Sequence, residues 1–164
     1  EFIRSIKNGS RKELVKAVEL SDKLLRATIN KDESTVAEII GEAHQANTSP
    51  KFYNNEQALR SVVIMAYLSS VDDYIRFEEL ASGKGYIDLL FLPALQSSKP
   101  ALIIELKWNK SAEKAIQQEQ DQQYWKFAKQ FRYKGKILLV GINYNSKTKK
   151  HTCKIKEIES LEKN

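Results

Sequence analysis

Apolar positions recur at helical spacing in the first part of the chain. Residues 11–29 carry such a repeat with Lys and Glu between its members, and residues 33–45 carry a second one. The members of the first repeat are Leu14, Val18, Leu25 and Ile29. The polar run that ends at Pro50 then breaks the periodicity. We therefore predict a helical hairpin or linker over residues 1–50 and a separate domain over residues 51–164.

The second part alternates helical and strand-like segments. The strand-like segments are short apolar or alternating runs, most of them bounded by Gly, Pro, Ser or Asn. The expected elements are a helix over residues 56–69, a strand over 72–80, two apolar strands that flank a turn between 83 and 109, a helix over 111–131, and a closing hairpin over 136–158. This order predicts an α/β fold in which helices flank a mixed sheet.

Composition is that of an ordinary globular protein. The 164 residues are enough for one compact domain with a sizeable core. Lys and Arg total 27 against 21 Asp and Glu, and the resulting net charge of +6 suits a phosphate-rich partner. No apolar run approaches the ~20 residues that cross a bilayer, and no signal peptide is visible. The single cysteine, Cys153, excludes an internal disulfide and fits the cytoplasm.

Several kinds of catalytic site are missing from the sequence. Zinc is not expected, because there is no CxxC motif and no pair of histidines at metal-ligand spacing. His44, His151 and Cys153 lack the sequence context of a catalytic triad. No P-loop signature occurs, so nucleotide hydrolysis by that route is not expected. Metal chemistry with oxygen ligands remains.

Charged residues interrupt two apolar strands where buried strands should carry none. Asp88 lies between two apolar residues, and Glu105-Leu106-Lys107 directly follows an apolar run. On a strand Glu105 and Lys107 share one face, and Leu106 points to the other. A lone buried carboxylate is costly, so these acids need partners. An acid on one strand, with an acid and a lysine on its neighbour, is an arrangement that holds a hard divalent cation beside a water.

Asp88, followed across a turn by Glu105-x-Lys107, resembles the PD-(D/E)XK nuclease superfamily. More narrowly, Gly-x-Gly-x-x-Asp followed by Ile-Ile-Glu-Leu-Lys is similar to the nuclease-like domain found after an AAA-ATPase-like domain in many bacterial proteins. The proline of the superfamily's name is absent, since Ile87 precedes the aspartate. The resemblance covers roughly residues 50–158. It implies a restriction-endonuclease-like αβββαβ core, here with one extra strand.

The resemblance also implies hydrolysis of phosphodiester bonds that depends on Mg²⁺, with Mn²⁺ as the alternative metal. Asp88 and Glu105 would bind the metal, and the backbone carbonyl of Leu106 is a candidate third ligand. Lys107 would position the nucleophilic water or offset charge on the phosphorus centre. Glu56 would hold a metal-bound water or a second ion. The alternative for Glu56 is an acid that favours the helix dipole from the first turn.

Further residues are candidates for substrate binding. In the resembled family a Gln followed by a Tyr recurs on the helix near the catalytic centre, and Gln118 or Gln120 with Tyr124 fits that pattern. Gln120 and Tyr124 are i,i+4 neighbours, which share a face on a continuous helix. Lys84, in a Gly-Lys-Gly turn, is placed to contact a phosphate. The alternative for each is a solvated surface residue, as it is for the basic run over 147–151.

Three functions remain open at this point. The first is an active nuclease domain that acts on DNA, with RNA as the other substrate. The second is a nucleic-acid-binding or regulatory module on the same fold with weak or no cleavage, and the third is an interaction domain whose charges are structural ion pairs. The joint presence of Asp88, Glu105 and Lys107 favours the first, and the modest net charge counts against it. Because the chain begins at Glu1 rather than Met, we expect a longer protein, and the resemblance implies an AAA-ATPase-like domain before this part.

Overall fold

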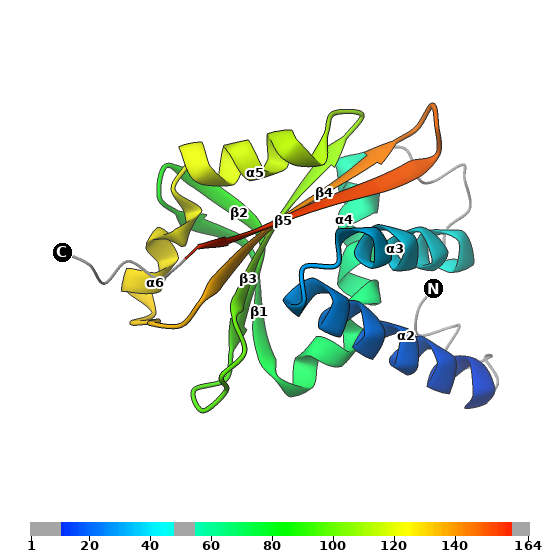
Figure 1. Ribbon diagram of the computed structural model, residues 1–164, viewed down its shortest axis with the longest axis horizontal. Helices are drawn as coiled ribbons and strands as arrows, with labels where there is room; N and C mark the ends of the chain where they lie inside the picture. Colours follow the sequence, from blue (N-terminus) through cyan, green and yellow to red (C-terminus); the bar gives the residue numbers. More distant parts are fainter. Residues whose placement is uncertain (1–10, 48–54, 159–164) are drawn as a thin grey trace.

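A five-stranded mixed sheet forms the centre of the fold (Figure 1). The computed structural model describes residues 11–47 and 55–158. In spatial order the strands are β1 (Tyr74–Ser82), β2 (Gly85–Pro93), β3 (Ala101–Trp108), β4 (Ile137–Asn145) and β5 (Lys150–Ile158). β3 and β4 run parallel, and the other neighbouring pairs are antiparallel. The predicted α/β fold with a mixed sheet is confirmed.

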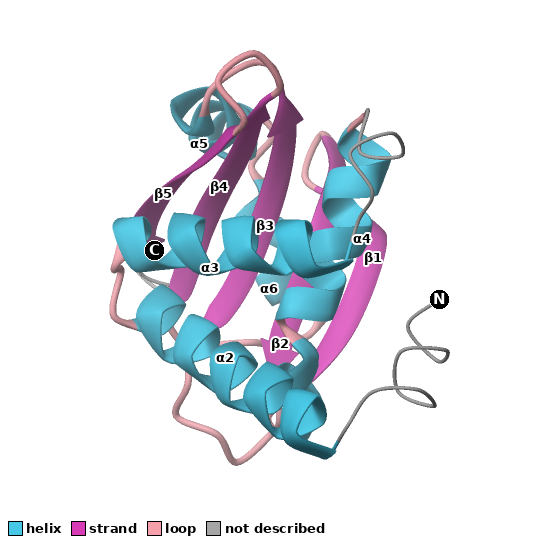
Figure 2. Cartoon of the chain, turned by 90° about the vertical axis from the view of Figure 1, so that its right-hand side faces the viewer, coloured by secondary structure: helices cyan, strands magenta, loops and turns pink. Residues whose placement is uncertain are grey.

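Helices of the described residues cover both faces of this sheet (Figures 1 and 2). They are α2 (Arg11–Ile29), α3 (Glu33–Asn47) and α4 (Glu56–Ala66), then α5 (Ala112–Asp121) and α6 (Phe127–Gln130). Each face has its own apolar cluster: Ile104 and Val140 belong to the first, Ile103 and Leu139 to the second. β3 and β4 are therefore buried on both faces, which explains why their sequences are almost continuously apolar.

The first two helices pack into the same core as the sheet. The carboxylate of Glu33, at the start of α3, accepts hydrogen bonds from the backbone N–H of Ile155 at 2.9 Å and from Lys154 Nζ at 3.0 Å. The hydroxyls of Thr28 and Tyr67 lie 2.7 Å apart and join α2 to the end of α4. The proposed division of the chain at residue 50 stays a prediction, because residues 48–54 lie outside the described part.

Both long helices predicted for the second part are shorter than the sequence indicates. The first ends at Ala66, and a 3-10 helix, η1 (Leu68–Asp72), leads into β1. The expected helix over 111–131 is wrong, because Gln123 adopts a left-handed backbone (φ 56°) and a 3-10 helix, η2 (Tyr124–Lys126), precedes α6. The β1–β2 turn supplies the reason for this break. The Lys84 N–H of this turn donates to the Gln122 carbonyl at 2.8 Å. In a continuous helix the same carbonyl would accept a hydrogen bond from within the helix.

The first turn of α5 lies directly on β4 at Gly141. A Cβ atom at this position would come within 2.4 Å of the Ala112 carbonyl oxygen and 2.8 Å of the Ala115 Cβ. Only a glycine therefore permits the observed approach of helix and strand.

None of the helices described for residues 11–47 and 55–158 combines the length and the apolar character needed to span a membrane.

Candidate active site

The site lies where β2 and β3 separate. Their last paired residues are Leu89 and Ile104, and the same register continued by one step would set Asp88 opposite Glu105. The ladder stops there, and the Leu106 N–H instead donates to Asp88 Oδ2 at 2.9 Å. Because the N–H and C=O of one strand residue point to the same side, the Leu106 carbonyl is directed towards the same gap. The prediction that Asp88 and Glu105 lie on adjacent strands is confirmed.

Glu105 and Lys107 form a buried ion pair on one face of β3. Lys107 Nζ lies 2.7 Å from Glu105 Oε1, and the two side chains are only 8% and 3% exposed. Leu106 points to the opposite face and belongs to the cluster under α2, α3 and α4. The alternation predicted for these three residues is therefore confirmed. A pair this well shielded from water holds a fixed geometry that an exposed pair does not.

Helix α5 adds Gln118 to this pair. Gln118 Nε2 donates to Glu105 Oε1 and also to the Tyr124 hydroxyl, the latter at 3.0 Å. Both residues thus lie at the site as the sequence indicated. Gln120 does not share a helix face with Tyr124, because the left-handed Gln123 separates them. The expected i,i+4 relation of Gln120 and Tyr124 is wrong for this reason.

The surroundings of Glu105 raise the pKa of its carboxyl group into the neutral range. Burial raises its pKa to about 7, the charge of Asp88 adds to the rise, and Lys107 opposes it. Glu56, in the first turn of α4, also raises this pKa, so its carboxylate lies within electrostatic reach. Glu105 Oε2 is buried and has no hydrogen-bond donor among the described residues. One carboxylate oxygen is thus left open for another ligand.

Two further charged residues lie at the site and were not singled out from the sequence. Arg60 on α4 donates from Nη2 to Asp88 Oδ1 at 2.9 Å and from Nη1 to Glu79 Oε1 at 2.7 Å. Arg60 follows Glu56 by four residues, so both lie on one side of α4, and this spacing is the signal that sequence reading could have used. Nothing in the sequence marks Glu79, because its part depends on the pairing of β1 with β2.

Glu119 is a buried acid on the sheet-facing side of α5. It is fully buried, and neither carboxylate oxygen has a partner at hydrogen-bond geometry among the described residues. Burial raises its pKa well above the usual range, Glu105 adds to the rise, and the Val140 backbone and Lys107 oppose it with smaller effects. Glu119 follows the buried Ala115 by four residues and so lies on the same, apolar face of the helix. This spacing is the feature of the sequence that indicates a buried acid.

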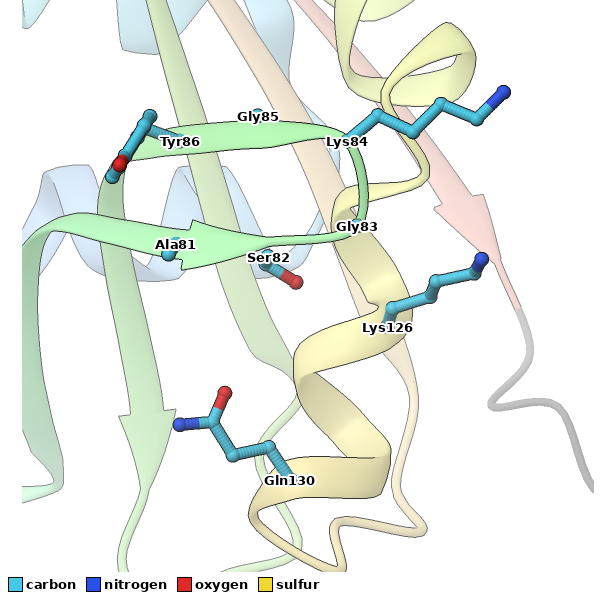
Figure 3. A pocket seen from close by; sticks show the side chains of 8 residues that line it. All are labelled: Ala81, Ser82, Gly83, Lys84, Gly85, Tyr86, Lys126 and Gln130. Atoms are coloured by element: carbon cyan, nitrogen blue, oxygen red, sulfur yellow. The ribbon is translucent and has the colours of Figure 1, made fainter.

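A groove of about 450 Å³ lies beside the β1–β2 turn (Figure 3). Its lining residues are Ala81, Ser82, Gly83, Lys84, Gly85, Tyr86, Lys126 and Gln130. The side chains of Lys84 and Lys126 extend to the same side of the turn, and Tyr86 lies at the other end. Ser82 Oγ donates to the Tyr124 carbonyl at 2.8 Å, so the groove wall is joined to the residue that holds Gln118.

The basic run over 147–151 lies at the β4–β5 turn. Lys147, Lys149 and Lys150 are exposed. His151 is half-buried, and its ring packs against Tyr144 with centroids 4.7 Å apart. The histidine is therefore part of the packing under this turn rather than of an exposed basic patch.

Within the described ranges no group of three or more His, Cys, Asp or Glu side chains forms a ready metal site. The residues at the β2–β3 gap nevertheless fit a hard cation. Asp88 and Glu105 supply carboxylates from adjacent strands, Glu105 Oε2 is open, and the Leu106 carbonyl faces the gap. Oxygen ligands of this kind suit a hard divalent cation.

Comparison with known proteins agrees with this geometry. The sequence model of the PD-(D/E)XK nuclease superfamily matches residues 54–154, which include β1 to β4, α4, α5 and the paired charges of the site. No curated protein matches the chain. The five-stranded mixed sheet flanked by helices is consistent with a restriction-endonuclease-like core. The chain belongs to the PD-(D/E)XK nuclease superfamily.

Proposed function

We propose that this domain hydrolyses phosphodiester bonds of nucleic acid, DNA first, with a divalent metal as cofactor. One observation carries the proposal: the buried Lys107–Glu105 pair lies beside Asp88 at the gap between β2 and β3. A structural ion pair alone does not need a third charged residue at a break in the sheet. The superfamily membership supports nuclease chemistry for the same residues.

Asp88, Glu105 and the Leu106 carbonyl are the residues that would hold Mg²⁺ or Mn²⁺. When bound, such a metal lowers the pKa of a coordinated water and neutralises charge on the phosphate. Glu105 must be ionised to serve as a ligand, and its pKa of about 7 makes that state depend on pH in the neutral range. Glu56 lies within electrostatic reach of Glu105, where it would hold a metal-bound water or a second ion.

Lys107 is placed to stabilise negative charge on the phosphate in the transition state. Its ammonium is held by Glu105 at 2.7 Å, so little reorganisation is needed when the substrate arrives. Gln118 binds the same Glu105 oxygen and fixes the carboxylate against rotation. Tyr124 in turn binds Gln118, so the two residues expected from the family pattern act here as a support for Glu105.

The groove beside the β1–β2 turn supports a path for the nucleic acid strand. Lys84 and Lys126 offer two cations to phosphates, and the exposed ring of Tyr86 offers a surface for base stacking. A rise of about 3.3 Å per residue places Asp88 roughly 10 Å along β2 from Gly85. That distance allows one strand to contact the groove and the catalytic residues together.

A nucleic-acid-binding module with weak or no cleavage is the second candidate function. The Arg60–Asp88 ion pair favours it, because a guanidinium already neutralises one of the two proposed metal ligands. We also propose that residues 51–164 carry the nuclease unit, and that an AAA-ATPase-like domain is its partner through the preceding helices.

The test is a cleavage assay with linear duplex DNA, single-stranded DNA and RNA, each with Mg²⁺, with Mn²⁺ and with EDTA. We expect cleavage with either metal and none with EDTA. A chain that binds these nucleic acids but leaves all of them intact with both metals would establish the binding module instead. A chain that neither binds nor cleaves any of them would exclude both functions.

A further inference from the structure

Arg60 is held between two carboxylates that come from facing positions of β1 and β2. Its Nη2 lies 2.9 Å from Asp88 Oδ1, and its Nη1 lies 2.7 Å from Glu79 Oε1. The Arg60 side chain is 18% exposed, and its Nε is buried without an acceptor among the described residues. The guanidinium is thus shielded but incompletely satisfied in this position.

The two carboxylates differ in what else holds them. Asp88 is 14% exposed, and its other oxygen accepts the Leu106 N–H, so both of its oxygens are engaged. Glu79 is 68% exposed and lies at the edge of the site. Arg60 therefore bridges from a partly buried acid of the proposed metal site to an acid in contact with solvent.

The backbone at Glu79 departs from the strand around it. The β1–β2 ladder pairs Glu78 with Leu89 and Leu80 with Ile87, but it omits Glu79 and Asp88, the facing pair between them. Glu79 has a left-handed backbone (φ 51°), which is unfavourable for a residue with a side chain. Arg60 thus contacts both members of the pair at which the β1–β2 ladder is interrupted.

A divalent cation at Asp88 and an arginine on the same carboxylate repel each other strongly. Arginine remains charged at all relevant pH values, so it cannot relieve the repulsion by losing a proton. Its fork can instead pair with Glu79 through both nitrogens. We propose that Arg60 is a positioning residue that neutralises Asp88 in the metal-free chain and moves to Glu79 alone when a divalent cation binds.

This inference rests on the metal site of the proposed function. The movement of Arg60 would contribute to the affinity of that site for the cation. The exchange weakens cation binding, because the ion pair with Asp88 must be broken first. It also compensates the negative charge of Asp88 when no cation is present.

The experiment measures binding of Mn²⁺ and Mg²⁺ alone, without nucleic acid, by calorimetry and by the shift of the melting temperature. Arg60→Met keeps the aliphatic length and removes the charge. We expect its metal-free form to melt lower than the parent, and its Mn²⁺ affinity to rise about fivefold or more, the lower end of typical coupling between sites. Arg60→Lys keeps the charge but loses the forked guanidinium. Its Mn²⁺ affinity and melting temperature should fall between those of the parent and Arg60→Met, and it serves as a second variant if Arg60→Met does not fold.

Glu79→Gln separates the exchange from a direct role of Glu79 as a ligand. Without an alternative partner Arg60 stays on Asp88, so the single variant should bind Mn²⁺ more weakly than the parent. In the Arg60→Met background the same change should have little effect. A loss that persists in the double variant would show that Glu79 itself binds the metal and would overturn the exchange.

Failure of this inference is distinct from failure of the metal site. If the parent binds Mn²⁺, Asp88→Asn abolishes binding, and both Arg60 variants bind like the parent, the exchange is wrong and the metal site stands. If neither the parent nor any Arg60 variant binds Mn²⁺ or Mg²⁺, both the metal site and the exchange are wrong.

Discussion

The ammonium of Lys107 lies 2.7 Å from the Glu105 carboxylate, and both side chains are almost fully removed from solvent. The residues are two apart on β3, so the strand itself sets them on one face. Removal of either partner leaves the other buried without its counter-charge, which is costly. Variants of this pair therefore need a folding control before any effect is read as catalytic.

Lys107→Ala should lose cleavage and keep cation binding at a pH high enough to ionise Glu105 without its lysine partner, because the lysine acts on the phosphate rather than on the metal. Loss of one preorganised transition-state contact costs ~10²–10³ in rate. Single-turnover cleavage with saturating Mg²⁺ measures the rate, and calorimetry with Mn²⁺ measures binding. Lys114→Ala, an exposed lysine on α5, is the matched control. Parental cleavage by Lys107→Ala would remove this residue from the proposed active site.

Asp88→Asn should lose both cation affinity and cleavage while the chain stays folded. The amide keeps the size of the carboxylate but removes the charge that a hard cation needs. Circular dichroism checks the fold, and calorimetry checks the affinity. Asp121→Asn, at the exposed end of α5, should leave both unchanged. Equal Mn²⁺ affinity in the two variants would contradict the assignment of Asp88.

Cation affinity should rise with pH through about 7, because burial holds the pKa of Glu105 near that value and the ligand must be ionised. Stability of the metal-free chain should change in the opposite direction. A raised pKa in the folded state contributes stability below the unfolded value of 4.5, and this contribution is lost as pH rises through about 7. Melting in EDTA between pH 4.5 and 8 tests this. Glu105→Gln should flatten the profile, and an unchanged profile would contradict the prediction.

Glu119→Leu should stabilise the domain. The native side chain is fully buried, and its carboxylate has no hydrogen-bond partner among the described residues, whereas leucine buries apolar surface at the same place. Removal of an unsatisfied buried polar group recovers about 1–3 kcal/mol. Urea unfolding at pH 7 measures the gain, and Glu113→Leu on the exposed side of α5 is the control. A Glu119→Leu variant less stable than the parent would show that the carboxylate has a partner in solution.

Charge reversal at Lys84 and Lys126 should weaken nucleic acid binding and reduce its salt dependence, because each phosphate contact contributes to the slope of affinity against salt. Fluorescence anisotropy with labelled single-stranded DNA over a series of salt concentrations measures both. The same two charge reversals at Lys147 and Lys149 provide a comparison of equal net charge on the β4–β5 turn. A larger loss from that second pair would place the strand along the β4–β5 turn.

The sequence predicted the parts of the site that depend on local pattern. Asp88, Glu105 and Lys107 were found because each interrupts an apolar strand, and the spacing of Glu105 and Lys107 fixes their common face. Gln118 was found through a family pattern, and it contacts Glu105 directly.

Residues that depend on tertiary contacts were missed. Arg60 reaches Asp88 only because α4 packs across the sheet, and Glu79 faces Asp88 only through the β1–β2 register. The helix break at Gln123 was missed for the same reason. Its cause is a hydrogen bond from Lys84, nearly forty residues earlier in the chain. Local propensity carries no information on such a partner.

The contact of α5 with Gly141 connects this position on β4 to the candidate active site on β3. A methyl group at Gly141 would meet the Ala112 carbonyl and push the first turns of the helix outward. Gln118 lies two turns further along that helix, so its amide would be withdrawn from Glu105. Gly141 is also the residue of β4 that pairs with Glu105, so Gly141→Ala would change the surroundings of this carboxylate with every proposed catalytic side chain still in place.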